Sequence, residues 1–284
     1  MNIGLVLSGG FAKGAYQVGA LRALSNFIPP HEIKYFSCAS IGALNGYAYA
    51  TGHLDRIEDL WRGFCQEDDK ILMTKVLRSG ALQDAIRSLH DEDCKLDRPF
   101  YCSMLDWRKL HLVYKDFSTV EDEKMPLYLK ASVAMPVYNR AVQIEDAYYF
   151  DGATVDNVPV YPLLKHEDLD YIICIYLDDT SYRFESTCFD NKIIQVTFPS
   201  ETMLKQALVL QRSSIEGMIQ SGYDRTMEIL SKVFAQGYEN LDHIYATIEE
   251  MNQNTKGCSL RITSDVLITN LNRVTKRLTK KKML

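Results

Sequence analysis

Residues 3–24 read IGLVLSGGFAKGAYQVGALRAL, an apolar run that stops at a pair of glycines and gives way to a helical pattern. The run at 3–7 is short and nearly continuous, which is typical of a strand buried on both faces in a parallel sheet. The apolar residues that then recur at helical spacing are Ala15, Val18, Leu21 and Leu24. The stretch therefore predicts a strand, a glycine-rich loop and a helix, the building unit of an α/β protein.

The following segment repeats this order. Residues 34–39 are strand-like, Ser40 occupies the turn, and residues 41–51 predict a helix rich in small side chains. Further strands are expected at 100–105, 110–114, 142–144, 148–150 and 171–177, with a short element at 127–133. Together these segments predict an α/β fold, a three-layer α/β/α arrangement with a mostly parallel central sheet.

The rest of the chain has a helical texture. Residues 54–98 are charge-rich and predict helices that serve either as a lid or acyl-chain wall or as an ordinary outer layer. Residues 203–221 and 223–234 predict two helices separated at Gly222. We expect one domain at 1–235 and a helical C-terminal extension at 236–284.

Composition excludes several classes of protein. Hydrophobic residues make up 46% and charged residues 24% of the 284, an ordinary globular balance. The net charge of −5 gives no reason to expect nucleic acid as a partner. The seven cysteines have no C-x-x-C pair and no zinc-ligand spacing, so free thiols in a reducing compartment are expected.

The ends of the sequence bear on location. No apolar run reaches the ~18 residues that a membrane span needs, and MNIGLVLSGG has no basic leader, so a cytoplasmic protein is expected. The segment LITNLNRVTKRLTKKKML (267–284) places an apolar stripe beside a basic end. It predicts either an interfacial helix drawn to anionic lipid, which would make the protein peripheral to a membrane, or a packed helix with a solvated basic end.

The glycine loop SGGFAKG (8–14) lies where nucleotide-binding loops lie, but it fits neither of their patterns. A dinucleotide loop needs a glycine at the position of Phe11, and a P-loop needs Lys followed by Ser or Thr after its last glycine. What remains is a row of backbone N–H groups at a helix N-terminus beside Lys13. This arrangement suits an anion, or a negative charge that develops during a reaction, although a simple tight turn would read the same way.

The stretch FSCASIGALNG (36–46) resembles a G-x-S-x-G nucleophile elbow with Cys38 in place of the first glycine. Ser40 is therefore a candidate nucleophile, and it needs a base. The histidines after it, His53, His90, His111, His166 and His243, do not lie in glycine-bounded loops at strand ends. Asp151 does lie at a strand end, followed by Gly152-Ala153, and is the stronger candidate base. A Ser-His-Asp esterase using His166 or His243 stays open as an alternative.

Four motifs in order carry a family resemblance: LVLSGGFAKGAYQVGAL (5–21), ASIGALNG (39–46), KASVAMPVYNR (130–140) and YFDGATVDNVPV (149–160). Over roughly residues 1–180 the chain resembles the patatin-like phospholipase family. The resemblance implies a Ser-Asp dyad without histidine, with Ser40 as nucleophile and Asp151 as its partner. It also implies an oxyanion loop at Gly9, Gly10, Phe11 and Ala12, with Lys13 at the family's Arg/Lys position, and an ordering role for Asp156, Asn157 and Pro159.

The implied activity is hydrolysis of fatty-acyl esters in phospholipid, lysophospholipid or acylglycerol. No metal or cofactor is expected, and no acidic Ca²⁺ loop is visible in the sequence. Two departures stand out: Phe11 replaces a glycine of the oxyanion loop, and Cys38 replaces a glycine of the elbow. They motivate an alternative, a catalytically degenerate patatin-like protein that binds membrane lipid.

Overall fold

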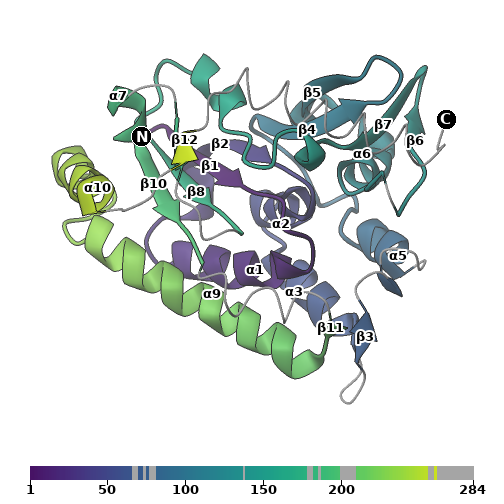
Figure 1. The fold of residues 1–284 in the computed structure, drawn as a ribbon, viewed down its shortest axis with the longest axis horizontal. Helices are drawn as coiled ribbons and strands as arrows, with labels where there is room; N and C mark the ends of the chain where they lie inside the picture. The colour runs from purple at the N-terminus through teal and green to yellow at the C-terminus, as the bar shows by residue number, and fades with distance from the viewer. Residues whose placement is uncertain are drawn as a thin grey trace.

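In the computed structural model, the described residues are 1–65, 70–72, 75–76, 81–136, 138–177, 182–184, 187–198, 209–254 and 259–260. They form a mixed α/β fold in which helices flank a central sheet (Figure 1). This confirms the predicted fold class. The basic segment at 267–284 lies outside the described residues.

The central sheet has eight strands in the order β10-β8-β1-β2-β4-β7-β6, with β5 also paired to β4. Their bounds are β1 (Ile3–Leu7), β2 (Ile33–Cys38), β4 (Phe100–Asp106), β5 (His111–Asp116), β6 (Val142–Ile144), β7 (Ala147–Asp151), β8 (Tyr171–Ile175) and β10 (Ile193–Val196). The pairs from β10 to β4 are parallel, and the pairs that β4 makes with β5 and β7 are antiparallel, as is β6 with β7. The parallel part puts the carboxyl ends of β1 and β2 at one edge, where ligands bind in open α/β sheets.

Helices cover one face of this sheet. They are α1 (Gly14–Leu24), α2 (Ile41–Ala50), α3 (Leu54–Gly63), α5 (Ala81–Ser88), α6 (Met125–Ser132), α9 (Arg212–Val233) and α10 (Leu241–Asn254). Their buried apolar side chains join those of β1, β2 and β4 in the larger of two core clusters. Figure 1 shows α9 running alongside α1, with α10 beside β10.

The opposite face has a thinner cover. The second core cluster combines Val6, Ile172 and Cys174 with Val158, Val160 and Leu163. These last residues come from the segment around the 3-10 helix η6 (Tyr161–Lys165). Within the described part of the chain, this layer consists largely of short 3-10 turns and extended segments, together with α7 (Thr187–Asp190).

Two expectations about the helical regions need correction. Gly222 was expected to separate two helices, but α9 is continuous through it. A Cβ at Gly222 would lie 2.0 Å from the carbonyl oxygen of Tyr16, and one at Gly19 would lie 1.8 Å from that of Ile219. These glycines let α1 and α9 pack backbone to backbone, so the residue that looked like a helix break is a close-contact site.

The second correction concerns residues 71–72, which were assigned to a helical block. They form the short strand β3 (Ile71–Leu72), antiparallel to β11 (Val209–Leu210). β11 itself lies within residues 203–221, which were expected to be helical, and α9 begins only at Arg212. A two-residue strand is too short to leave a periodic signal in the sequence. A further small pair joins β9 (Tyr182–Arg183) to β12 (Ser259–Leu260), so the extension that was expected to be helical also contains a short strand.

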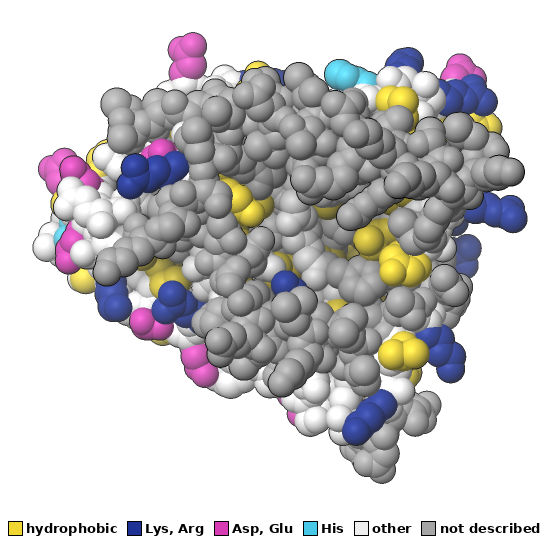
Figure 2. Space-filling model, in the orientation of Figure 1, with side chains coloured by type: hydrophobic (Ala, Val, Ile, Leu, Met, Phe, Trp, Pro, Cys, Tyr) yellow, Lys and Arg dark blue, Asp and Glu magenta, His cyan; other side chains and the backbone are white. Residues whose placement is uncertain are grey.

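Figure 2 shows one face of the molecule with the charged side chains of the described residues coloured. The coloured lysine and arginine side chains lie mainly around its margin, and acidic side chains accompany them chiefly on the left of the view. Among the described helices, none combines the length and apolar character needed to cross a bilayer.

Candidate active site

Ser40 lies in a sharp turn between β2 and α2. Its backbone has φ 53° and ψ −128°, a conformation that non-glycine residues rarely adopt. The serine is 8% exposed, and α2 begins at the next residue. Strain of this kind persists where the surrounding structure imposes it. A sharp, strained turn between a strand and a helix is also the backbone geometry of a nucleophile elbow.

Close packing around the turn explains its small residues. A Cβ at Gly42 would lie 2.6 Å from the carbonyl oxygen of Leu7, so only glycine lets α2 approach the end of β1 this closely. Cys38 is fully buried, and its Sγ would lie 2.7 Å from a Cβ at Gly46. Space for the Cys38 side chain thus comes from a glycine eight residues later, and burial raises the pKa of the thiol, which keeps it uncharged.

Asp151 ends β7 and directs its carboxylate to Ser40. The Ser40 hydroxyl lies near enough to this carboxylate to lower its pKa, and the N–H of Ala153 donates to its Oδ1 at 2.8 Å. The residue is 2% exposed, and this burial raises its pKa to about 7, against the lowering effects of Ser40 and the Ala153 N–H. The group is therefore balanced between its acid and base forms near neutral pH.

The residue after Asp151 must be glycine. A Cβ at Gly152 would lie 2.3 Å from the backbone carbon of Ser103 in β4. The 3-10 turn η5 (Gly152–Thr154) therefore folds directly against the neighbouring strand and holds the aspartate at its N-cap position.

The glycine loop lies against the nucleophile. A Cβ at Gly9 would lie 2.9 Å from Cβ of Ser40, and one at Gly10 would lie 2.3 Å from Cδ1 of Leu177. The loop then enters the 3-10 turn η1 (Phe11–Lys13), which leads into α1. The first N–H groups of such a turn have no partner within the helix and face outward at its N-terminus.

The chain matches a known family over more than half its length. The sequence profile described as patatin-like phospholipase matches residues 5–164, which include the loop, Ser40 and Asp151. The chain belongs to the patatin-like phospholipase family. Membership indicates lipid acyl hydrolysis as the class of activity.

Solved structures of similar proteins include VipD and ExoU. VipD from Legionella pneumophila is 13% identical, with a TM-score of 0.47, and the match covers 98% of this chain and 75% of that chain. The type III effector protein ExoU is 12% identical, with a TM-score of 0.41, and the match covers 89% of this chain and 62% of that chain. Neither likeness is close, and the family assignment rests on the sequence match.

Among the loop residues, Gly9 differs from the others expected to bind the oxyanion. Its N–H donates to the carbonyl of Asn157 at 3.1 Å, so this donor is engaged. Lys13 is engaged as well, because its Nζ donates to the carbonyl of Leu177 at 3.2 Å and so braces the loop. The remaining candidate oxyanion donors of this patatin-like loop are therefore the backbone N–H groups of Gly10, Phe11 and Ala12.

A buried network that the sequence analysis missed supports the same loop. Gln17 Nε2 donates to the carbonyl of Ser8 at 2.8 Å, and Asn45 Nδ2 donates to the carbonyl of Gly14 at 2.9 Å. Asn45 also donates to Gln17 Oε1 (2.9 Å) and accepts from Trp61 Nε1 (3.2 Å). Both ends of the loop are therefore tied to α2, the helix that begins directly after Ser40. The sequence did contain a signal for this network. Gln17 and Asn45 are amides at otherwise apolar helical positions, and a buried amide needs hydrogen-bond partners.

The segment after the dyad aspartate is fixed from several sides. Asp156 accepts from Tyr114 Oη at 2.5 Å and from the Val158 N–H at 3.3 Å. Ser37 Oγ donates to the carbonyl of Pro159 at 2.5 Å. With the Gly9–Asn157 bond, these contacts connect the segment to both β2 and the loop, consistent with the ordering role that the resemblance implies for Asp156, Asn157 and Pro159.

The histidines make their contacts elsewhere. His166 stacks on Tyr35 at a centroid distance of 3.8 Å and contacts Tyr101 Oη, and His243 contacts the carbonyl of Lys232. His90 contacts Tyr47 Oη at 2.6 Å. The geometry thus favours Asp151 over the histidine alternative as the partner of Ser40.

One cluster has metal-ligand side chains. His53, Asp91 and Cys94 bring their ligand atoms within 4.8 Å of one another. The Arg56 guanidinium also lies there, 2.6 Å from an Asp91 oxygen and 3.5 Å from Cys94 Sγ. Because this cation already satisfies the acidic member, we assign no metal to the cluster.

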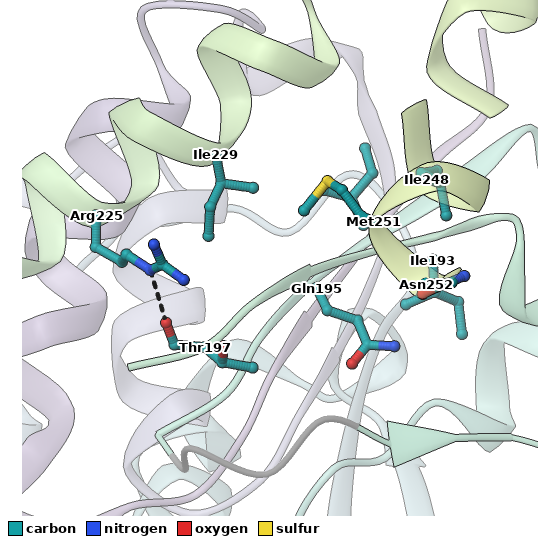
Figure 3. Close-up of a pocket in the computed structure, with 9 residues that line it drawn as sticks. Ile193, Gln195, Thr197, Arg225, Ile229, Ile248, Met251 and Asn252 are labelled. Carbon is teal, nitrogen blue, oxygen red and sulfur yellow. Dashed lines mark hydrogen bonds between the residues drawn. The ribbon is translucent and has the colours of Figure 1, made fainter. Parts of the chain in front are cut away.

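A cavity of about 270 Å³ lies between β10, α9 and α10 (Figure 3), and its lining includes neither Ser40 nor Asp151. Its charged member, Arg225, donates through Nε to the carbonyl of Thr197 at 3.3 Å and pairs with Glu228 at 2.7 Å. The wall is otherwise largely apolar, with Ile229, Ile248 and Met251. With its arginine already engaged, this cavity shows no reactive constellation.

Proposed function

We propose that this protein is a serine lipid acyl hydrolase of the phospholipase A or lysophospholipase type, with Ser40 as nucleophile and Asp151 as general base. The observation that carries the proposal is the placement of Ser40, held on a strained elbow, beside the buried carboxylate of Asp151. A serine is a weak nucleophile until a nearby base accepts its proton, and a carboxylate with a pKa of about 7 can do so near neutral pH.

The proposed reaction has two steps. In the first, Asp151 takes the hydroxyl proton as Ser40 Oγ bonds to the ester carbonyl carbon. The resulting oxyanion accepts hydrogen bonds from the Gly10–Ala12 N–H groups, each worth roughly 3–4 kcal/mol in comparable sites. The intermediate then collapses, the bond to the alcohol breaks, and Asp151 returns its proton to the leaving oxygen.

The second step releases the fatty acid. Asp151 accepts a proton from water, the water oxygen attacks the acyl carbon, and the Ser40–acyl bond breaks as the proton returns to Ser40 Oγ. Every proton in the cycle passes through one carboxylate.

The domain division and location are proposed alongside the activity. Tyr171 Oη donates to the carbonyl of Tyr238 at 3.0 Å, and Tyr245 Oη donates to that of Asp170 at 2.8 Å. We propose a catalytic domain at 1–235 with an extension at 236–284 whose α10 docks on it through these contacts. We propose a cytoplasmic location with peripheral membrane contact.

The experiment is fatty-acid release from mixed phospholipid, lysophospholipid and acylglycerol micelles by the wild type beside Ser40→Ala, with Ser25→Ala as the matched control. Ser25 caps α1 and lies away from the dyad. Release by the wild type and by Ser25→Ala, and its loss in Ser40→Ala, supports the proposal. Equal release by all three variants would contradict it.

The alternative is a degenerate lipid-binding relative, motivated by Cys38 and Phe11. The packing of Cys38 against Gly46 weighs against it, because the substitution leaves room for the elbow. If a folded wild type bound the micelles without turnover of any acyl ester, this alternative would take precedence.

A further inference from the structure

An open cavity of about 520 Å³ lies on the far side of β7 from the Asp151 carboxylate. Its lining comprises Trp107, Arg108, Pro136, Asn139, Arg140, Ala141, Tyr148 and Phe150. Phe150 directly precedes Asp151, and consecutive side chains of a strand point to opposite faces. The N–H of Asp151 donates to the carbonyl of Ala134 at 2.9 Å, two residues before Pro136. The cavity therefore lies on the opposite face of the strand that carries Asp151.

Two arginines give this cavity its chemistry. The Arg108 guanidinium lies 4.4 Å from the centroid of the Tyr148 ring, and Arg140 is exposed at the rim. Within the described residues, no carboxylate pairs with either guanidinium at 4.0 Å or less. The neighbouring acid, Asp106, accepts from the backbone N–H groups of Arg108 and Lys109 and pairs with Lys109 Nζ at 3.8 Å.

The remaining walls are aromatic. Trp107 and Phe150 meet edge to face with centroids 5.6 Å apart, and the Trp107 N–H of the backbone donates to the carbonyl of Tyr148 at 2.7 Å. The position of Trp107 is thus set by β7 itself. A cavity that combines planar cationic donors with apolar walls suits an anion attached to an apolar body.

We propose that this cavity binds a phosphate group through Arg108 and Arg140, and that the phosphate belongs to the head group of a membrane phospholipid. Guanidinium groups match phosphate oxygens through paired N–H donors, and the aromatic walls would contact the glycerol part of the lipid. The assignment to a lipid rests on the proposed function. The phosphate chemistry rests on the cavity alone.

The test uses the full chain carrying Ser40→Ala, so that no lipid is consumed. In this background, Arg108→Gln/Arg140→Gln is compared with Lys95→Gln/Lys130→Gln, which removes the same charge from exposed positions outside the cavity. Thermal unfolding first establishes that both variants fold like the parent. Partition is then measured on phosphatidylcholine vesicles containing phosphatidic acid, and on vesicles containing oleate at the same zeta potential.

On phosphatidic acid vesicles, the arginine variant is expected to lose about tenfold or more in partition, and the lysine variant less than about threefold, because each exposed basic charge contributes only a weak general attraction. On oleate vesicles, where the anion is a carboxylate, the two variants are expected to lose similar, small amounts. Equal losses by both variants on phosphatidic acid would overturn the proposal.

Titration with inorganic phosphate separates the two sources of the ligand. Phosphate binding that is lost only in the arginine variant, together with the vesicle result, supports a lipid phosphate site. Phosphate binding lost only in that variant, with vesicle partition unchanged, would overturn the lipid source in favour of a soluble phosphate. Because the parent is inactive, these outcomes are distinct from a failure of the Ser40–Asp151 hydrolase, which would appear as no turnover by the wild type.

Discussion

Asp151→Asn is expected to lower fatty-acid release by about 10³-fold or more while making the protein more stable at alkaline pH. Asparagine has nearly the shape of aspartate but cannot accept the Ser40 proton. The Asp151 carboxylate is buried, and its pKa is raised from 3.8 to about 7, so the ionised form that the chemistry needs is also the form that the fold disfavours.

The sign of the stability change follows from the direction of this shift. Between pH 3.8 and about 7, folded Asp151 holds a proton that the unfolded chain has released, so folding is favoured at low pH. This contribution is complete below the unfolded pKa and is lost as the pH rises through 7. Above pH 7, burying the charged carboxylate lowers the stability of the fold by on the order of 4 kcal/mol, a cost that Asp151→Asn would remove.

Calorimetric unfolding of the wild type and Asp151→Asn at pH 5 and pH 8 tests this directly. The stability advantage of the variant is expected to be larger at pH 8, and wild-type kcat/KM is expected to rise as Asp151 deprotonates near pH 7. A variant with full activity, or one less stable than the wild type at pH 8, would contradict the assignment of Asp151.

Gly222→Ala is expected to destabilise the fold by more than about 4 kcal/mol, among the largest effects of a single substitution. The added Cβ would lie 2.0 Å from the carbonyl oxygen of Tyr16, which belongs to α1 and cannot move as a flexible side chain would. Because α1 carries the oxyanion loop at its N-terminus, forcing α1 and α9 apart should also displace that loop.

Gly217→Ala in the same helix is the matched control. A Cβ there would have nothing within 4 Å, so the change should be neutral or stabilise α9 by up to about 1 kcal/mol through helix propensity. Urea unfolding of both variants gives the comparison. Equal stabilities would mean that the α1–α9 contact is looser than the structure indicates.

The sequence predicted the frame of the fold because its signals are local. The strand at 3–7 matches β1, and the strand expected at 34–39 matches β2 within one residue at either end, because buried strands need continuous apolar side chains. Gly222 was misread because a glycine within a helical pattern looks the same whether it breaks the helix or admits a neighbouring backbone. The choice depends on Tyr16, about 200 positions away, which no local pattern contains.

At the candidate site, too, local signals in the sequence were readable, whereas contacts that depend on the fold were not. Ser40 and Asp151 follow from motifs, but the packing of Cys38 against Gly46 depends on how closely α2 approaches β2. The bond from the Gly9 N–H to Asn157 joins segments that are distant in the sequence. The amides Gln17 and Asn45 were also invisible as a pair, because they lie on different helices and meet only when α1 and α2 pack.

Covalent labelling with a serine-reactive probe tests most directly whether Ser40 is a nucleophile activated by Asp151. The full chain and Asp151→Asn would each be incubated with a fluorophosphonate at pH 8, and the labelled peptide identified by mass spectrometry. We expect one adduct, on Ser40, that forms rapidly in the wild type and far more slowly in Asp151→Asn. An adduct on another residue, or equal labelling rates in the two proteins, would contradict it.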